Sequence, residues 1–307
     1  MPSRAVPPSR RVLLAFAATA VGGGLAGCSD GSGAPAPPAP PASSPSAAPA
    51  SAATTPVAGA GTPAASAVAA GPVEVSRVTF ASAARGRQVG MVVIAPGGSR
   101  DGLPACLVLH GRGDDAERSV GLLNLDRYLT AALAVGVAPF ALVAVDGGET
   151  YWHRRASGDD PEKMIIDEVL PRFAGLGLRA TRLAATGWSM GGYGALLLAR
   201  RHPGLVVAVA ASSPAMWPSY GASAPGAFDS RADFAAHPVL GTPPVPGVSY
   251  RIDCGAADPF LAVSRQAARD LAASEQNFGP GGHTPEYWRS VVPAQLAFLS
   301  GALSRAA

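Results

Sequence analysis

A serine between two glycines is the residue of this chain whose setting most clearly suggests chemistry. Residues 187–191 read G-W-S-M-G, and they join an apolar run typical of a strand, 182–186, to a run typical of a helix, 192–201. Such a sharp strand-to-helix turn presents a serine to substrate at the edge of a sheet, and the glycines relieve crowding around it. The pattern predicts Ser189 as a nucleophile that attacks a carbonyl carbon.

A serine hydroxyl needs a general base, and the base needs a carboxylate that fixes its tautomer. Three histidines follow Ser189 in the chain. We expect His202 to cap the end of the helix after the serine, and His237, in a polar and Ala-rich stretch, to be exposed. His283 lies in a glycine-rich loop before an amphipathic C-terminal segment, so it is the predicted base. The alternative is a loop histidine that only caps that helix.

The acid is expected after the nucleophile and before the base, on a loop that follows a strand. The alternating apolar run 248–254 leads into G-A-A-D-P, which places Asp258 on such a loop. Asp followed by Pro is also a helix-start signal, so Asp258 could cap a helix over 260–273 in addition to orienting the base. Asp253 lies inside the strand and is the weaker candidate.

Two backbone amides are expected to stabilise the oxyanion that forms when the serine attacks. One is the amide of Met190, directly after the serine. The second is assigned to Arg112, because the buried run 105–109 ends in H-G-R-G, where glycines let the backbone turn its amides inward. The alternative is an ordinary turn that leaves the Arg112 side chain in solvent.

Four motifs in this order resemble the putative esterase family of α/β-hydrolases. That family includes esterase D type S-formylglutathione hydrolases, bacterial feruloyl and siderophore esterases, and the mycolyltransferases. The motifs are L-H-G at 109–111, G-W-S-M-G-G-Y-G at 187–194, C-G-A-A-D at 254–258 and G-G-H at 281–283. The likeness spans about residues 75–304. It implies an α/β-hydrolase fold with Ser189, Asp258 and His283 as the catalytic triad.

One departure from the family bears on the reaction. The mycolyltransferases resemble one another in carrying Asp-Gly where this chain has His110 and Gly111. The difference favours a general ester hydrolase over an acyltransferase, although both proceed through the same acyl-enzyme and differ in whether water or an alcohol attacks it.

Several large side chains on loops at the expected catalytic edge could line an acyl or alcohol pocket, the alternative for each being ordinary packing. The candidates for substrate binding are His110, Tyr151, Trp152, Trp188, Met216, Trp217 and Phe260. No spacing of His, Cys, Asp and Glu suggests a catalytic metal, and no cofactor is expected.

The N-terminus predicts export. Three arginines precede an apolar run, 12–21, that is too short to span a bilayer, and L-A-G-C follows at 25–28. This resembles a lipobox and predicts a signal peptide over 1–27 with a lipid anchor in the membrane at Cys28. The alternative is an ordinary secretory signal. Residues 28–72, almost entirely Ala, Pro, Ser, Gly and Thr, are predicted to be a disordered linker.

Residues 73–307 are expected to form one esterase domain with an α/β-hydrolase fold. Strand-like runs alternate with helical patterns, which favours a mostly parallel sheet with helices on both faces. The strand-like runs are 75–80, 89–94, 105–109, 140–145, 182–186, 206–211 and 248–254, and one further helix is expected from 161 to 173. Without the three leader arginines, 21 Lys and Arg balance 21 Asp and Glu, so no nucleic-acid partner is expected.

The sequence therefore predicts an extracytoplasmic serine carboxylesterase that acts on a small-molecule, lipid or polysaccharide ester and is held at the membrane through its lipid. One alternative is an acyltransferase that moves acyl groups onto envelope sugars or lipids. Another is a lipoprotein that uses a catalytically inactive hydrolase fold for binding or envelope structure. Binding alone, however, does not require an intact serine, acid and histidine.

Overall fold

The computed structural model describes residues 72–307. The predicted signal peptide, the predicted lipidation site Cys28 and the predicted linker up to residue 71 lie outside the described residues. Within residues 72–307, none of the helices combines the length and the apolar content needed to cross a membrane.

In this part of the chain, eight strands form one sheet with the order β1-β2-β4-β3-β5-β6-β7-β8. The two N-terminal pairings, β1 with β2 and β2 with β4, are antiparallel, and every later pairing is parallel. The sheet is therefore mostly parallel, as the sequence predicts. The strands are β1 (Val73–Ser82), β2 (Arg87–Pro96), β3 (Ala105–Leu109), β4 (Ala141–Val145), β5 (Leu183–Trp188), β6 (Val206–Ser212), β7 (Ser249–Asp253) and β8 (Glu275–Asn277).

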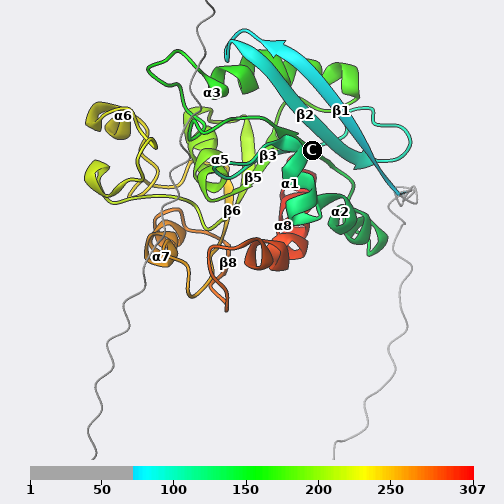
Figure 1. Cartoon of the computed structure of the whole chain (residues 1–307). Coiled ribbons are helices and arrows are strands. Elements are labelled where there is room, and N and C mark those ends of the chain that lie inside the picture. Colours follow the sequence, from blue (N-terminus) through cyan, green and yellow to red (C-terminus); the bar gives the residue numbers. More distant parts are fainter. Residues whose placement is uncertain (1–71) are drawn as a thin grey trace, which may run out of the picture. The chain divides into compact units, whose positions relative to one another are not determined.

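Helices cover both faces of this sheet, which explains why the central strands are continuous apolar runs. Figure 1 shows α1, α2 and α8 grouped on one face, where α1 and α2 contact β1, β2 and β4, and α8 contacts β5, β6 and β7. Helix α5 packs on the other face, against β3, β5 and β6. The long helices are α1 (Ala116–Leu123), α2 (Leu125–Ala134), α5 (Met190–Arg201), α7 (Leu261–Asp270) and α8 (Pro285–Arg305). This is the α/β-hydrolase arrangement that was predicted.

The structure differs from the sequence expectations at one helix and one short strand. The helix expected from 161 to 173 is divided by a π-helical turn, which widens its middle. Strand β8 was not predicted, because its three residues are polar and exposed at the sheet edge. The remaining segments are α3 (Pro161–Met164), η1 (Ile165–Val169), α4 (Leu170–Arg172), η2 (Ala174–Leu176), η3 (Tyr220–Ala222) and α6 (Arg231–Ala236).

The start of α5 lies directly against the end of β3, backbone on backbone. A Cβ atom at Gly191 would lie 1.8 Å from the carbonyl oxygen of Leu109, and one at Gly187 would lie 2.5 Å from that same oxygen. Neither oxygen nor helix can move away without breaking the sheet, so both positions require glycine. The G-x-S-x-G spacing thus reflects a packing requirement between two neighbouring elements.

Replacement of Gly191 by alanine should lower the free energy of unfolding by about 3 kcal/mol or more, because the new methyl group overlaps a main-chain carbonyl. Urea denaturation measures the change. Gly121→Ala is the matched control: this exposed glycine in α1 has open space around its Cβ position, so alanine there should stabilise the protein by roughly 0.5–1 kcal/mol. Equal stability of the Gly191 variant and the wild type would contradict the packing argument.

Candidate active site

Ser189 occupies a strained turn between β5 and α5. Its φ of 54° and ψ of −120° lie outside the regions that a residue with a side chain normally adopts. Two hydrogen bonds hold the turn in place: the Ser189 amide donates to the Ser212 carbonyl (2.9 Å), and the Ser189 carbonyl accepts from the Ala215 amide (3.0 Å). These contacts with the end of β6 and the loop after it hold the strained backbone of Ser189. The turn places the serine hydroxyl beyond the end of the sheet.

The other two residues predicted for the triad lie beside this serine. His283 Nε2 is 2.9 Å from Ser189 Oγ, and His283 Nδ1 is 2.9 Å from Asp258 Oδ2. Asp258 follows β7 and His283 follows β8, and because parallel strands end at the same edge of the sheet, their loops meet there. With Nδ1–H donating to the carboxylate, the lone pair on Nε2 accepts from the serine hydroxyl, which is the arrangement of a general base.

The carboxylate of Asp258 is held in its ionised form. Burial raises the pKa of Asp258, but hydrogen bonds from His283, from the Phe260 amide and from Ser213 together keep that pKa below its ordinary value. The Phe260 amide donates to Oδ1 over 2.8 Å, which fixes the carboxylate within its own loop. Asp258 thus makes the expected contact with the histidine, but it does not cap the helix: the N-cap of α7 is Phe260, and no side chain makes a capping hydrogen bond there.

Asp253, the weaker candidate, belongs to the core. Its carboxylate accepts from Arg251 Nε (2.9 Å) and from Gln295 Nε2 (2.7 Å), which ties β7 to α8. The side chain is fully buried and does not contact His283. Its role is to satisfy buried polar groups.

Ser213 and Trp288 support the site and were not found from the sequence. Ser213 is fully buried with φ of 46°, and its hydroxyl hydrogen bonds to the Asp258 carboxylate. Its oxygen accepts from Trp288 Nε1 (3.1 Å), while the Trp288 ring stands edge-on to the His283 ring with centroids 5.0 Å apart. The backbone strain and the indole contact join β6, α8 and the acid. No sequence motif marks either residue.

The two amides predicted to form the oxyanion hole stay a prediction. Met190 is the first residue of α5, so its amide has no acceptor within that helix, and the helix N-terminus favours an anion. Arg112 lies on the loop after β3, three residues beyond Leu109, which is paired in register with Gly187. The Arg112 side chain turns elsewhere, with Nε donating to Glu149 (2.9 Å) and Nη1 to the Pro225 carbonyl (3.2 Å).

Comparison with known families agrees with this geometry. The family model described as "Putative esterase" matches residues 82–299, which is most of the chain. The protein belongs to this esterase family. It is therefore an enzyme of the serine hydrolase class, whose chemistry is ester hydrolysis or acyl transfer.

Solved structures show the same fold. A ferulic acid esterase is 22% identical with a TM-score of 0.66, covering 76% of this chain and 99% of its own. An S-formylglutathione hydrolase from Agrobacterium tumefaciens is 16% identical (TM-score 0.62; 76% and 96% covered). MPT51 (FbpC1) from Mycobacterium tuberculosis is 16% identical (TM-score 0.57; 75% and 99% covered). A search of curated protein sequences gave no significant match.

In this esterase, His110 is a structural residue, and its prediction as a substrate contact is wrong. The side chain is fully buried, and burial lowers its pKa. Nε2 accepts from the Gly147 amide (2.9 Å), and Nδ1 donates to the Gly111 carbonyl (2.7 Å). The neutral ring thereby fastens the loop after β3 to the loop after β4.

Trp152 and Trp188 are also wrong as substrate contacts, because both fill the interior. Trp152 is packed against Gly147 and Gly194, and its indole N–H donates to the His110 carbonyl (3.2 Å). Trp188, only 2% exposed, points to the face of the sheet that α1, α2 and α8 cover, and there its ring packs near that of Trp288. Position at the end of a strand did not reveal to which face the ring would point.

The remaining substrate-binding candidates lie near the triad or next to a cavity. The Phe260 ring is 5.3 Å from the His283 ring and 5.6 Å from that of Trp217, measured between centroids. Met216 and Trp217 line a cavity of about 240 Å³. Tyr151 is buried and packs against Trp217, one of the residues that line this cavity. The binding of substrate by these four residues stays a prediction.

The other two histidines after the serine behave differently from each other. His202 ends α5 as expected, and its Nε2 lies 2.8 Å from Glu162 Oε1. His237 was expected to be exposed, but its side chain is only 10% exposed and lies against His153. Tertiary packing of two distant segments covers it.

The two aspartates can be separated by experiment. Asp258→Asn should lower kcat by about 10³–10⁴-fold with little loss of stability, because the amide cannot hold His283 in the required tautomer. Asp253→Asn should keep the kcat of the folded protein but lower the free energy of unfolding by about 2–3 kcal/mol, since Arg251 loses one of its two carboxylate partners. Steady-state kinetics on an activated ester and urea denaturation measure both. The reverse pattern would make Asp253 the acid.

Proposed function

We propose that this enzyme hydrolyses carboxylic esters outside the cytoplasm through an acyl-enzyme on Ser189. The observation that carries the proposal is the continuous relay from Ser189 Oγ through His283 to Asp258, with 2.9 Å at each contact. A nucleophile, a base and an orienting carboxylate in this geometry are what acyl transfer requires.

The chemistry follows from the positions of the atoms. As Oγ of Ser189 bonds to the ester carbonyl carbon, Nε2 of His283 takes the hydroxyl proton, and the carbonyl oxygen becomes an oxyanion between the amides of Met190 and Arg112. The carbon–oxygen bond to the alcohol then breaks, and the imidazolium returns its proton to the departing alcohol. Water repeats the sequence on the acyl-enzyme and releases the acid, while Asp258 stabilises the imidazolium each time it forms.

Hydrolysis is preferred over acyl transfer because of the His110 departure from the mycolyltransferase pattern. The alternative of transfer onto envelope sugars or lipids shares every step up to the acyl-enzyme. An added alcohol or sugar that captures the acyl group in place of water would establish transfer. Products that remain purely carboxylic acid across a panel of acceptors would establish hydrolysis.

Ser189→Ala should lower esterase kcat by several orders of magnitude and abolish labelling by a fluorophosphonate, since the attacking oxygen is gone. Turnover of p-nitrophenyl esters of short and long acyl chains measures the first effect, and gel fluorescence the second. Ser219→Ala, at an exposed serine after β6, is the control and should keep both signals. A loss of less than about a hundredfold in kcat for the Ser189 variant, or labelling that survives in it, would refute the acyl-enzyme.

The location outside the cytoplasm rests on the N-terminal residues alone. A lipid on the Cys28 thiol would anchor the enzyme, and the composition of residues 29–72 suits a spacer between membrane and domain.

Cys28→Ser should therefore move the protein from the membrane fraction to the soluble fraction and remove incorporation of a labelled fatty acid. Ser29→Ala, directly beside it, should change neither. Fractionation of cells that express each variant tests this. A Cys28 variant that stays in the membrane fraction would contradict the anchor.

A further inference from the structure

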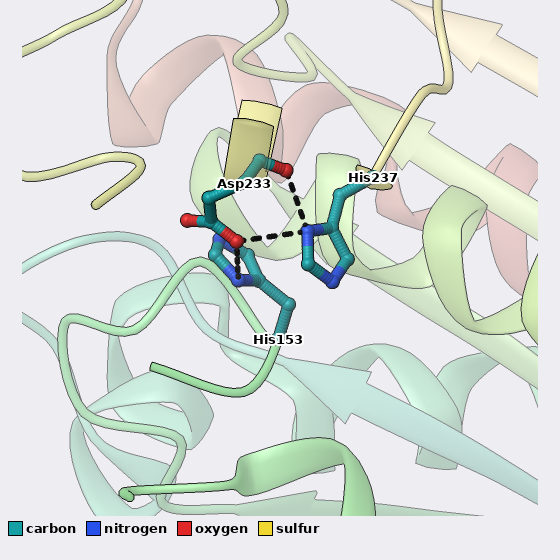
Figure 2. Close-up of side chains that lie close together, drawn as sticks. All are labelled: His153, Asp233 and His237. Carbon is teal, nitrogen blue, oxygen red and sulfur yellow. Dashed lines mark hydrogen bonds and ion pairs between the residues drawn. The ribbon is translucent and has the colours of Figure 1, made fainter. Parts of the chain in front are cut away.

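Two histidines and an aspartate meet on the side of the molecule that carries α6 (Figure 2). His153 comes from the loop after β4, Asp233 from α6, and His237 directly follows that helix. Asp233 Oδ1 lies 3.1 Å from His237 Nδ1 and 3.6 Å from His153 Nδ1, and one ligand atom from each of the three residues lies within 4.8 Å of the others. The side chains are mostly buried, so this is not a solvated group of surface charges.

The outer contacts of the cluster hold two of the three groups in the orientation of ligands. His153 Nε2 faces the Ala227 carbonyl at 3.2 Å, and when it donates there the lone pair of the neutral ring is on Nδ1, toward Asp233. The second carboxylate oxygen of Asp233 accepts from the Asp229 amide (2.8 Å). Histidines that bind metals commonly donate their other N–H to a carbonyl in this way.

The hydrogen-bond acceptors around His153 outnumber the protons that its neutral ring can donate. His153 Nδ1 faces two oxygens, the Arg154 carbonyl at 3.1 Å and Asp233 Oδ1 at 3.6 Å. If Nε2 carries the proton of the neutral ring, the Nδ1 lone pair points toward these oxygens, which is repulsive unless a cation lies between them.

We propose that His153 Nδ1, Asp233 Oδ1 and His237 Nδ1 bind one divalent transition-metal ion, with zinc as the best match. Two imidazoles and a carboxylate are a common ligand set for zinc. Bonds of about 2.0–2.1 Å in a tetrahedron place neighbouring ligand atoms about 3.3 Å apart, and the two groups already oriented as ligands, Asp233 Oδ1 and His153 Nδ1, are 3.6 Å apart. A water molecule would complete the coordination.

Binding requires one local change. His237 Nδ1 donates to the main-chain carbonyl of Asp233 (2.8 Å), and the two imidazole rings are stacked with centroids 4.3 Å apart. The His237 ring must transfer its proton to Nε2 and rotate, because a metal lies in the plane of each ring that binds it. His237 ends α6 and is not within a helix or strand, so this rotation disturbs no secondary structure.

The ion would join α6 to the interior. His237 also lines the cavity of about 240 Å³, its carbonyl accepts from the Tyr193 hydroxyl on α5 (2.8 Å), and Phe228 stacks on His153. A metal at the cluster therefore fixes one wall of the cavity beside Met216 and Trp217. None of the three ligands belongs to the proposed triad, so the proposed role of the ion is structural.

The test begins with the purified protein after treatment with EDTA and dialysis. Zinc titrated against a chromophoric chelator at neutral pH should bind at one equivalent per chain. At a free zinc concentration about a hundredfold above Kd, Tm should rise by roughly 5–10 °C. Cobalt in place of zinc should give the intense visible bands of a four-coordinate ion. Wild-type protein that takes up no metal, or whose Tm responds to pH and not to zinc, would overturn the proposal.

Variants locate the ion. Asp233→Asn and His237→Gln should each weaken zinc binding by at least a hundredfold while Tm in EDTA stays near that of the wild type, since Asn can still accept from the Asp229 amide. His202→Gln, at a histidine outside the cluster, should bind zinc normally. His283→Gln should also bind normally. Zinc binding that is lost with His283 and kept in the Asp233 and His237 variants would place the ion at the proposed triad and refute the cluster as its site.

Discussion

The contact between the end of β3 and the start of α5 is the constraint on which the candidate active site depends. Only hydrogen atoms at positions 187 and 191 allow the helix to approach the Leu109 carbonyl so closely. That approach fixes where Ser189 stands and brings the first amide of α5 next to the loop that carries Arg112. Nucleophile and proposed oxyanion donors thus derive from one backbone contact, which gives them a common frame before any side chain is considered.

The acid and the base come from the loops after β7 and β8, the strands that follow β6 in the sheet order. The loops after β7 and β8 reach the same edge because the strands are parallel, and α8, which follows them, contacts His283 through Trp288. Ser213 is held in a left-handed conformation between Asp258 and Trp288, and Trp288 in turn faces His283. Ser189 and Ser213 directly follow the neighbouring strands β5 and β6, and the backbone strain at both is offset by the hydrogen bonds around them, as is common where groups must be held for chemistry.

The sequence predicted the parts of the site that depend on local pattern. Gly–x–Ser–x–Gly, the Asp-Pro pair after a strand and the glycine-rich loop at His283 each carry a backbone requirement that residue types reveal. The direction in which each side chain points, toward the catalytic edge or into the core, was not predictable in the same way. His110 and Trp188 stand at strand ends near the catalytic edge, but their contacts with Gly147 and Trp288 turn them inward. Contacts between distant segments, such as His153 with His237, leave no spacing to recognise.

The position of helix α8 in the sequence also determines the order in which the parts of the site are synthesised. The helix begins two residues after His283 and supplies Trp288 and Gln295, which hold Ser213 and Asp253 in the strands before it. While the chain is being synthesised, Ser189 leaves the ribosome before Asp258, His283 and all of α8, which follow it in the sequence. Because His283 precedes α8, a nascent chain that ends before this helix holds Ser189, Asp258 and His283 but lacks Trp288, which faces His283, and Gln295. The residues that hold Ser213 and Asp253 in place therefore follow the nucleophile, the acid and the base in the order of synthesis.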